Sequence, residues 1–309
     1  RDDIYPARYG AWDAAIRLAQ PAEIEGKTHD LVIIGTPPDS HMAIARNVLT
    51  TTPPRVMLIE KPLCTPSLDN AQEILDLAQA AGTFLAVGYN HTMTENTRVA
   101  EEILATGVLG KPLSISSRTR EHWGGIFGAH PWLSGPQDTY LGFWRRGGGA
   151  TGEHSHAINI FQHFAHATGM GRVVEVRATL DMVETDKVSY DRLSLAGLRT
   201  ENGFVGDVTQ DVLTEPAQKY LRIQGDAGFL EWAVNVDGGH DAVRWGTGRG
   251  PAQERLIAKK RPDDFKGEID HLGTILDGAS TTDAAGSPID ARRGLDTMLV
   301  IAAIYLSHE

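Results

Sequence analysis

The chain has 309 residues, of which 41% are apolar and 22% are charged, and its formal net charge at pH 7 is −11. This length allows two domains, and an acidic balance without a basic cluster excludes a nucleic-acid-binding role. No apolar run approaches the roughly 20 residues of a membrane helix, so no segment is expected to span a bilayer. A single cysteine, Cys64, excludes an internal disulfide framework and is typical of a cytoplasmic protein.

The first hundred residues alternate between short apolar runs and helical segments. Apolar runs without alternation are typical of strands that are covered on both faces. Strands and helices that alternate at this spacing predict a parallel sheet with right-handed crossovers. The expected elements are a helix over 11–20, a strand over 29–35, a helix over 41–49, a strand over 55–60, a helix over 67–81 and a strand over 84–90.

After a helix over 95–106, polar and apolar residues alternate, which predicts an antiparallel sheet with one open face. The fold class is therefore α/β plus α+β, with a first domain over 1–110 and a second over 111–309, and the C-terminal helices can pack back on the first domain. The expected strands are 113–120, 172–181, 191–199, 204–211, 219–225 and 228–236, and the expected helices are 151–168, 265–277 and 290–307.

The strand over 55–60 ends in Glu60-Lys61-Pro62. Ligands of parallel sheets gather beyond the carboxyl ends of the strands, and a proline there ends the strand. Lys61 is therefore a candidate reactive group. The alternative is that Glu60 and Lys61 are ordinary solvated charges at a strand end.

Several short motifs occur in a fixed order along the chain. They are Thr36-Pro37-Pro38-Asp39-Ser40-His41, Glu60-Lys61-Pro62, Val87-Gly88-Tyr89-Asn90, Trp144-Arg145 before Gly147-Gly148-Gly149, Ile223 to Glu231, and Asp290-Ala291-Arg292. In this order they resemble the Gfo/Idh/MocA family of oxidoreductases, from about residue 5 to the end of the chain. The resemblance implies a Rossmann-type first domain that binds NAD or NADP. It also implies a second domain whose sheet forms the substrate pocket and a subunit interface, so a homodimer or homotetramer is expected.

The family mostly oxidises or reduces a secondary hydroxyl of a sugar or cyclitol, so the implied partner is a small molecule of that class. By the same resemblance, Lys61 hydrogen-bonds the reacting oxygen. The residues expected to line the dinucleotide are Thr36, Pro37, Pro38, His41, Glu60, Lys61, Asn90, Trp144 and Arg145.

The family also places a histidine one helical turn after an aspartate, just beyond its glycines. Here His156 would be that histidine, but the residue four positions before it is Gly152. Glu153 lies three positions before His156 and shares a helical face with it, so it can supply the carboxylate. We expect His156 to be the acid–base partner, because imidazole exchanges protons near neutral pH. The alternatives are that His156 works with Lys61 alone, or is only hydrogen-bonded between the domains.

Two further sets of residues have side chains that can act as ligands. His154 and His156 are two apart on a predicted helix and point about 200° apart, so no metal site is expected. His163 and His166, further along the same helix, are expected at the surface or in an interface. Substrate recognition is expected from the segment that leads from the first alternating strand into a glycine-rich loop, although a tryptophan there can equally be a packing anchor. This set is Arg118, Arg120, Glu121, His122 and Trp123.

A phosphate-binding GxGxxG loop does not follow any strand of the first domain. The glycine-rich segment 246–250 lacks the required spacing and is predicted to be a surface turn. We expect a strand, a helix and a second strand to precede Arg1; the alternative is that this member of the family is naturally shorter. The residue that separates NAD from NADP lies at the end of that second strand. Two other functions stay open: a non-catalytic sensor of dinucleotide or sugar, and a lyase or glycosidase that uses tightly bound NAD transiently.

Overall fold

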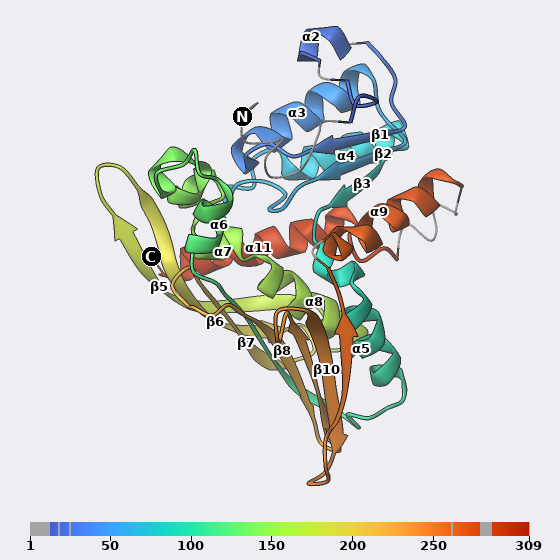
Figure 1. The fold of residues 1–309 in the computed structure, drawn as a ribbon, viewed down its shortest axis with the longest axis vertical. Coiled ribbons are helices and arrows are strands. Elements are labelled where there is room, and N and C mark those ends of the chain that lie inside the picture. The colour runs from blue at the N-terminus through green and yellow to red at the C-terminus, as the bar shows by residue number, and fades with distance from the viewer. Residues whose placement is uncertain (1–12, 18, 25, 261, 279–285, 309) are drawn as a thin grey trace.

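The computed structural model describes residues 13–17, 19–24, 26–260, 262–278 and 286–308. The described chain forms a three-stranded parallel sheet and an eight-stranded, mostly antiparallel sheet, with helices packed on both (Figure 1). The predicted combination of a parallel sheet and a large, mostly antiparallel sheet is therefore confirmed. The division between residues 110 and 111 stays a prediction.

The parallel sheet has the strand order β1-β2-β3, with β1 at Leu31–Ile34, β2 at Val56–Ile59 and β3 at Phe84–Val87. Each strand is apolar throughout, and helices cover both faces of the sheet, although Ile33 at the β1 edge is 49% exposed. Helices α3 (Pro38–Thr51) and α4 (Ala71–Ala81) pack on one face, and α9 (Asp263–Leu276) packs on the other. Within the described ranges, no strand pairs with the outer edge of β1.

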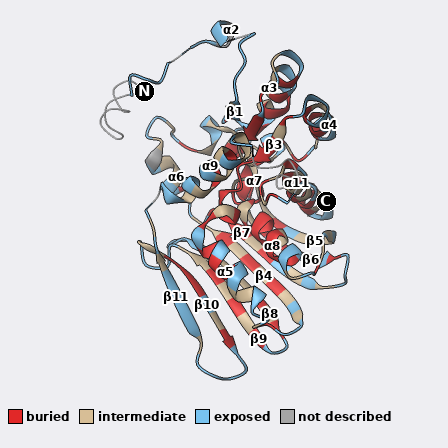
Figure 2. Cartoon of the chain, turned by 90° about the vertical axis from the view of Figure 1, so that its right-hand side faces the viewer, coloured by how far each residue is buried: buried red, intermediate tan, exposed pale blue. Residues whose placement is uncertain are grey.

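The large sheet has the order β11-β10-β9-β8-β4-β7-β6-β5, and all its pairs are antiparallel except β4 with β7. Helix α8 (His156–Ala167) lies across β4, β7 and β8, and α5 (Glu95–Ala105) lies on β9 and β10. The opposite face of the sheet carries no helix in Figure 1, and the edge strand β11 is largely exposed (Figure 2). The strands are β4 (Pro112–Arg120), β5 (Val173–Glu184), β6 (Ser189–Thr200), β7 (Val205–Asp211), β8 (Gln218–Gly225), β9 (Gly228–Val234), β10 (His240–Thr247) and β11 (Gln253–Ala258).

Helix α11 (Ala291–His308) connects the two halves, because it packs against β5 and α8 of the second half and against β3 and α4 of the first. Figure 1 shows it running between the two sheets. The remaining elements are short. They are α2 (Pro21–Ile24), η1 (Asn90–Met93), α6 (Gly124–Ala129), η2 (Pro136–Asp138), η3 (Tyr140–Gly142), η4 (Trp144–Arg146) and α7 (Gly149–Glu153).

Two predicted helices differ from the structure, and two strands were not predicted. The helix expected over 11–20 is wrong for residues 13–17, which form a turn, while residues 11 and 12 lie outside the described residues. The strands β10 and β11 were not predicted, and the hairpin between them contains the predicted turn at 246–250. The helix expected over 151–168 is two helices, α7 and α8. They separate at Ser155, where the amides of Ser155 and Ala157 bond carbonyls three residues back, which tightens the chain out of the α-helix.

Candidate functional site

Lys61 leaves the carboxyl end of β2 and reaches across to α7 in the second half of the molecule. Its Nζ lies 2.7 Å from the main-chain oxygen of Glu153 and 3.0 Å from Oε2 of the same residue. The side chains of Lys61 and Glu153 are only 15% and 18% exposed. The hydroxyl of Tyr140 donates to Glu153 Oε2 at 3.2 Å. The predicted lysine and the predicted carboxylate therefore meet in one partly buried ion pair.

The charge of Glu153 is maintained by its neighbours. Burial disfavours the ionised carboxyl, but attraction by Lys61 and hydrogen bonds from Lys61 and Tyr140 outweigh it, so the pKa of Glu153 is lowered. Burial and the adjacent carboxylate raise the pKa of Tyr140 well above its ordinary value, so this phenol stays a donor. The arrangement is a fixed carboxylate that orients a lysine.

Asp191 of β6 holds α7, and with it Glu153, in place. Its Oδ2 accepts hydrogen bonds from the amide and the hydroxyl of Thr151 at 2.8 and 2.6 Å, and its Oδ1 accepts one from the hydroxyl of Tyr305 at 2.6 Å. Gly149 has a φ of +76°, and a Cβ there would lie 1.9 Å from Asp191 Oδ1. Only glycine combines this backbone conformation with so close an approach, which explains the last residue of the Gly147-Gly148-Gly149 motif.

The ring of His156 stacks on His91, with centroids 4.3 Å apart and an interplanar angle of 30°, and meets the ring of Tyr89 edge-on. Its Nδ1 is buried and has no hydrogen-bond partner in the described part of the chain. Burial lowers the pKa of both His156 and His91 well below the ordinary value, and the charges of Lys61 and Lys219 lower both further. Both imidazoles are therefore neutral near pH 7, and sequence reasoning did not identify His91.

A second lysine–carboxylate pair lies near the first. Lys219 of β8 lies opposite Thr119 of β4, and its Nζ is 2.9 Å from Oε2 of Glu121, which follows β4. The Nε2 of His154 lies 3.3 Å from the main-chain oxygen of Glu121. A carbonyl only accepts, so this nitrogen carries the proton. Sequence reasoning missed Lys219, although the alternation of β8 places it on the same side as the buried Leu221 and could have signalled it.

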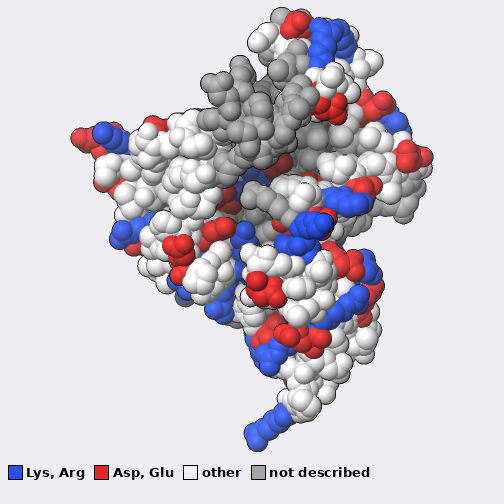
Figure 3. Space-filling view, in the orientation of Figure 1, with Lys and Arg blue, Asp and Glu red and all other residues white. Residues whose placement is uncertain are grey.

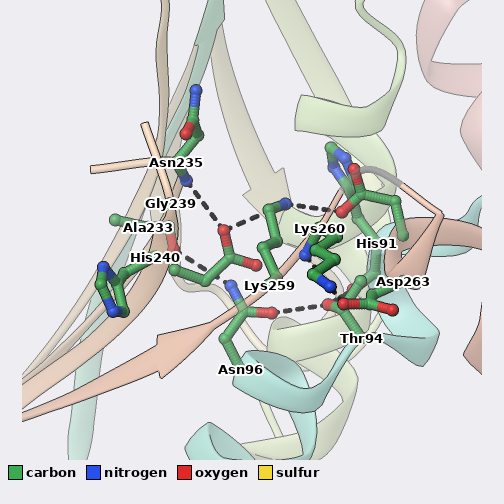
Figure 4. Close-up of polar contacts among 12 residues, drawn as sticks. His91, Thr94, Asn96, Ala233, Asn235, Gly239, His240, Lys259, Lys260 and Asp263 are labelled. Carbon is green, nitrogen blue, oxygen red and sulfur yellow. Dashed lines mark hydrogen bonds and ion pairs between the residues drawn. The ribbon is translucent and has the colours of Figure 1, made fainter. Parts of the chain in front are cut away.

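A third lysine, Lys259, lies just beyond β11, and its positive charge helps to lower the pKa of His91. Its Nζ is 3.0 Å from Asp241 Oδ1 and 2.5 Å from Asp264 Oδ1. Figure 4 shows Lys259 between Asn235, on the side of the sheet, and His91. This residue was also missed, because the strand before it was not predicted.

The residues expected to line a dinucleotide divide into two groups. Thr36, Glu60 and Asn90 follow the carboxyl ends of β1, β2 and β3, where ligands of parallel sheets gather. The carboxylate of Glu60 lies over Gly88, and Asn90 Oδ1 is buried without a hydrogen-bond partner among the described residues.

The others have contacts within the protein. His41 is fully buried, and its Nε2 lies 2.7 Å from the main-chain oxygen of Thr36. Its Nδ1 lies 3.2 Å from the carbonyls of Pro62 and Leu63, so this ring ties the Thr36 loop to the turn after Lys61. Pro38 begins α3 and is buried, and Pro37 precedes it as the N-cap.

Trp144 and Arg145 lie against the C-terminal helix. The ring of Trp144 stacks on Tyr305 with centroids 4.4 Å apart, and the guanidinium of Arg145 covers the Trp144 ring at 4.2 Å. Both side chains therefore pack against other residues of the chain.

Of the five residues expected to contact substrate, the structure groups only Glu121 with Lys61. Ser117 donates to the main-chain oxygen of Ala157 in α8, so Arg118 and Arg120, at even positions of the same strand, belong to the open face. Arg118 covers the ring of Tyr220 at 4.9 Å, and Arg120 pairs with Asp211.

The last two of the five lie in the following loop. His122 Nδ1 accepts from the amide of Gly124 at 2.9 Å. Trp123 is 6% exposed and packs against Phe127 and Tyr190, as a packing anchor does.

The histidines further along α8 lie away from these pairs. His166 is exposed, as expected. His163 is only 6% exposed, so a surface position is wrong for it, and an interface position stays a prediction. Its Nε2 lies 2.9 Å from Glu101 Oε1. Within the described ranges, no group of three or more His, Cys, Asp or Glu is arranged to hold a metal ion, and no helix is long and apolar enough to cross a membrane.

Comparison with known proteins identifies both halves of the chain. Residues 17–89 match the family model described as "Oxidoreductase family, NAD-binding Rossmann fold", and residues 97–231 match the GFO/IDH/MocA C-terminal domain. A curated relative from Comamonas testosteroni, 1-carboxy-3-chloro-3,4-dihydroxycyclo hexa-1,5-diene dehydrogenase, is 27% identical over 183 residues, which are 58% of this chain and 41% of the relative. The uncharacterized oxidoreductase YdgJ of Escherichia coli (strain K12) is 29% identical over 120 residues, which are 36% of this chain and 34% of YdgJ. The matched part thus spans less than half the length of these relatives.

Solved structures show the same fold. An inositol dehydrogenase homolog from Azotobacter vinelandii, complexed with NADH and myo-inositol, superposes with a TM-score of 0.70 at 17% identity over 90% of this chain and 76% of that chain. An aldose-aldose oxidoreductase from Caulobacter crescentus, complexed with glycerol, has a TM-score of 0.70 at 20% identity over 90% of this chain and 77% of that one. With both domain models matched in order over residues 17–89 and 97–231, the chain belongs to the Gfo/Idh/MocA family of oxidoreductases, whose first domain is an NAD-binding Rossmann fold.

Proposed function

We propose that the protein is an NAD(P)-dependent dehydrogenase or reductase that transfers a hydride between a nicotinamide cofactor and the carbon of a secondary hydroxyl or ketone of a sugar or cyclitol. The observation that carries the proposal is the Lys61–Glu153 ion pair beside the neutral ring of His156. The myo-inositol and glycerol named for two proteins of the same fold support a polyol substrate.

The residues beyond the first sheet fit a dinucleotide. Thr36, Glu60 and Asn90 follow three adjacent parallel strands, and the orphaned, buried Oδ1 of Asn90 is an acceptor without a partner among the described residues. We assign these residues to holding the cofactor, which when bound supplies the hydride acceptor. NAD and NADP are both consistent with these residues.

Lys61, His156 and Glu153 have separate tasks in this proposal. Lys61 donates a hydrogen bond to the reacting oxygen, since its ammonium lies at the carboxyl end of β2. His156 is in the unprotonated form that can take the hydroxyl proton, and its buried Nδ1 has no partner among the described residues. Glu153 orients Lys61, and Tyr140 in turn orients Glu153. Hydride can leave the carbinol carbon only as the hydroxyl proton passes to His156.

The proposal is tested by incubating the protein with NAD or NADP and a panel of sugars and inositols while the absorbance of the reduced nicotinamide is followed. We expect reduction with at least one member of the panel. Release of an aldose or of a dehydrated product without net change of the nicotinamide would instead indicate the lyase or glycosidase alternative. Dinucleotide binding without any turnover would indicate the sensor.

We also propose that copies of the chain associate through the open face of the large sheet. Alternation along β6 and β7 places Leu195 and Val205 on this face, where they are 46% and 52% exposed. Light scattering should give a dimer or tetramer, and Leu195→Arg should shift the mass toward the monomer. An unchanged mass, or a monomeric parent protein, would contradict this assignment.

A further inference from the structure

We propose that Lys219 and Glu121 form a second hydroxyl-binding subsite beside Lys61 and Glu153, and that these two pairs together select an uncharged polyol over the corresponding sugar acid. The inference rests on the proposed function and deepens it, because it names the charge class of the substrate and a residue of β8 that recognises it. Each pair offers ammonium donors and carboxylate acceptors, and a hydroxyl group can use both.

One residue, His154, connects the Lys61–Glu153 pair to the Lys219–Glu121 pair. His154 directly follows Glu153 in the chain, and its Nε2 lies 3.3 Å from the main-chain oxygen of Glu121. The positive charges of Lys219 and Lys61 both help to lower the pKa values of His91, His154 and His156. The two lysines therefore lie around the same neutral imidazoles. A substrate oxygen that reaches Lys61 beside His156 places its neighbouring hydroxyl groups toward the second pair.

Both pairs are also open enough to meet a ligand. The side chain of Lys219 is 27% exposed and that of Glu121 is 33% exposed, so neither is sealed in the core. Lys61 and Glu153 are less exposed, at 15% and 18%, so Lys219 and Glu121 are the pair more accessible to solvent.

Charge balance determines the substrate class. Three lysines help to lower the pKa of His91, and each already has a carboxylate partner. The pairs are Lys61 with Glu153 at 3.0 Å, Lys219 with Glu121 at 2.9 Å, and Lys259 with Asp241 at 3.0 Å. A substrate carboxylate entering here would meet no unpaired ammonium from this set. It would also lie near the carboxylates of Glu121 and Glu153, which already repel each other. A partly buried, unpaired anion is costly, whereas neutral hydroxyl groups lose nothing of this kind.

The experiment compares matched sugars on the wild-type protein and on two variants. D-glucose and D-galactose are compared with D-glucuronate and D-galacturonate, which differ only in a carboxylate at C6. Binding is measured by saturation-transfer NMR, and oxidation by nicotinamide absorbance. We expect the neutral sugars to bind wild type about tenfold or more tightly than their acids, the size of a hydrogen-bonded charge effect.

The variants change the charge at the subsite in opposite directions. Glu121→Gln frees the ammonium of Lys219, so the acid-to-neutral affinity ratio should rise about tenfold. Lys219→Met leaves Glu121 unpaired, so neutral sugars should bind about tenfold more weakly and the acids should stay weak. The matched controls are Lys266→Met and Asp270→Asn, which break an ion pair on α9 whose side chains are 67% and 60% exposed. These controls should keep the wild-type ratio.

The outcomes separate the two proposals. Tighter binding of the acids to wild type, or an unchanged ratio in Glu121→Gln with the fold intact by circular dichroism, overturns the subsite while the dehydrogenase assignment stands. Failure of every sugar in the panel to bind and to react overturns the subsite and the proposed function together.

Discussion

The ammonium of Lys61 lies 3.0 Å from Oε2 of Glu153, although 92 residues separate the two positions in the chain. The contact joins the end of a parallel strand to a short helix of the second half, so the proposed reaction centre exists only in the assembled molecule. Replacing Lys61 by alanine should lower turnover by about 10²- to 10⁴-fold, the usual contribution of a positioned proton-transfer group.

In the same Lys61→Ala variant, dinucleotide binding should remain measurable, because Thr36 and Asn90 are untouched. Turnover is checked by nicotinamide absorbance and binding by fluorescence titration. As a control, Lys111→Ala removes an exposed lysine outside the site and should leave both quantities unchanged. Wild-type turnover in Lys61→Ala would refute the role given to this residue.

Gly149 and Gly169 form a matched pair for testing the anchor of α7. Both have positive φ, +76° and +73°, but a Cβ at Gly149 would overlap Asp191 Oδ1, whereas nothing lies within 4 Å of a Cβ at Gly169. Gly169→Ala should cost about 1 kcal/mol of unfolding free energy from backbone strain alone. Gly149→Ala should cost clearly more, about 3 kcal/mol, since Asp191 must also shift. Urea unfolding of both variants measures the difference, and equal losses would show that the contact with Asp191 is unimportant.

Asp191 itself should be sensitive to the loss of one acceptor oxygen. Asp191→Asn places an amide against three donors from Thr151 and Tyr305, so one donor is left unpaired and the expected loss of stability is about 1–3 kcal/mol. Tyr305→Phe removes only one donor and should cost about 1 kcal/mol. Chemical denaturation gives both values, and an order in which Tyr305→Phe is the more damaging variant would contradict this view of the anchor.

Glu268 predicts a pH dependence of stability. This residue of α9 is 2% exposed, and its Oε1 has no hydrogen-bond partner in the described ranges. Burial, and then repulsion by Glu60, raise its pKa from 4.5 to about 8. Because the folded-state pKa is raised, its stabilising contribution is complete below pH 4.5 and is lost as the pH rises through 8. Each unit of pKa difference is worth about 1.4 kcal/mol.

Glu268→Gln removes the ionisation and keeps the shape of the side chain. The variant should therefore lose less stability than wild type between pH 5 and pH 8. Thermal unfolding at several pH values measures this difference, with the exposed Glu254→Gln of β11 as the control that keeps the wild-type profile. Parallel profiles for Glu268→Gln and wild type would show that Glu268 is ionised throughout.

Sequence reasoning identified the parts of the site that are encoded locally. Glu60-Lys61-Pro62 ends a continuous apolar strand, and strand exits are visible in the pattern of neighbouring residues. Glu153 was found by helical spacing, although the helix in fact breaks at Ser155, and the carboxylate reaches Lys61 from the short helix before the break.

The residues that were missed depend on pairing between distant segments. Lys219 becomes a site residue only because β8 pairs with β4, which brings it to Glu121, and no local pattern encodes that register. His91 and Lys259 approach each other through η1 and the end of β11, and the latter strand was not recognised. Conversely, Arg118 was a plausible sugar ligand by composition, but the strand register places it on the open face against Tyr220.

The mixture of charges on the surface also has a local origin. On the face shown in Figure 3, Lys and Arg are interspersed with Asp and Glu. Elsewhere in the described chain, opposite charges also meet in ion pairs such as Arg46–Glu73 and Arg172–Asp296. Although the net charge is −11, this face therefore carries no single large acidic area.

Helix α11 packs against the edge strand β5 of one sheet and the strand β3 of the other. Strand β3 of the parallel sheet and the edge strand β5 of the large sheet therefore depend on one shared helix. Neither half can melt while the other keeps all its contacts, so calorimetry should record a single cooperative transition.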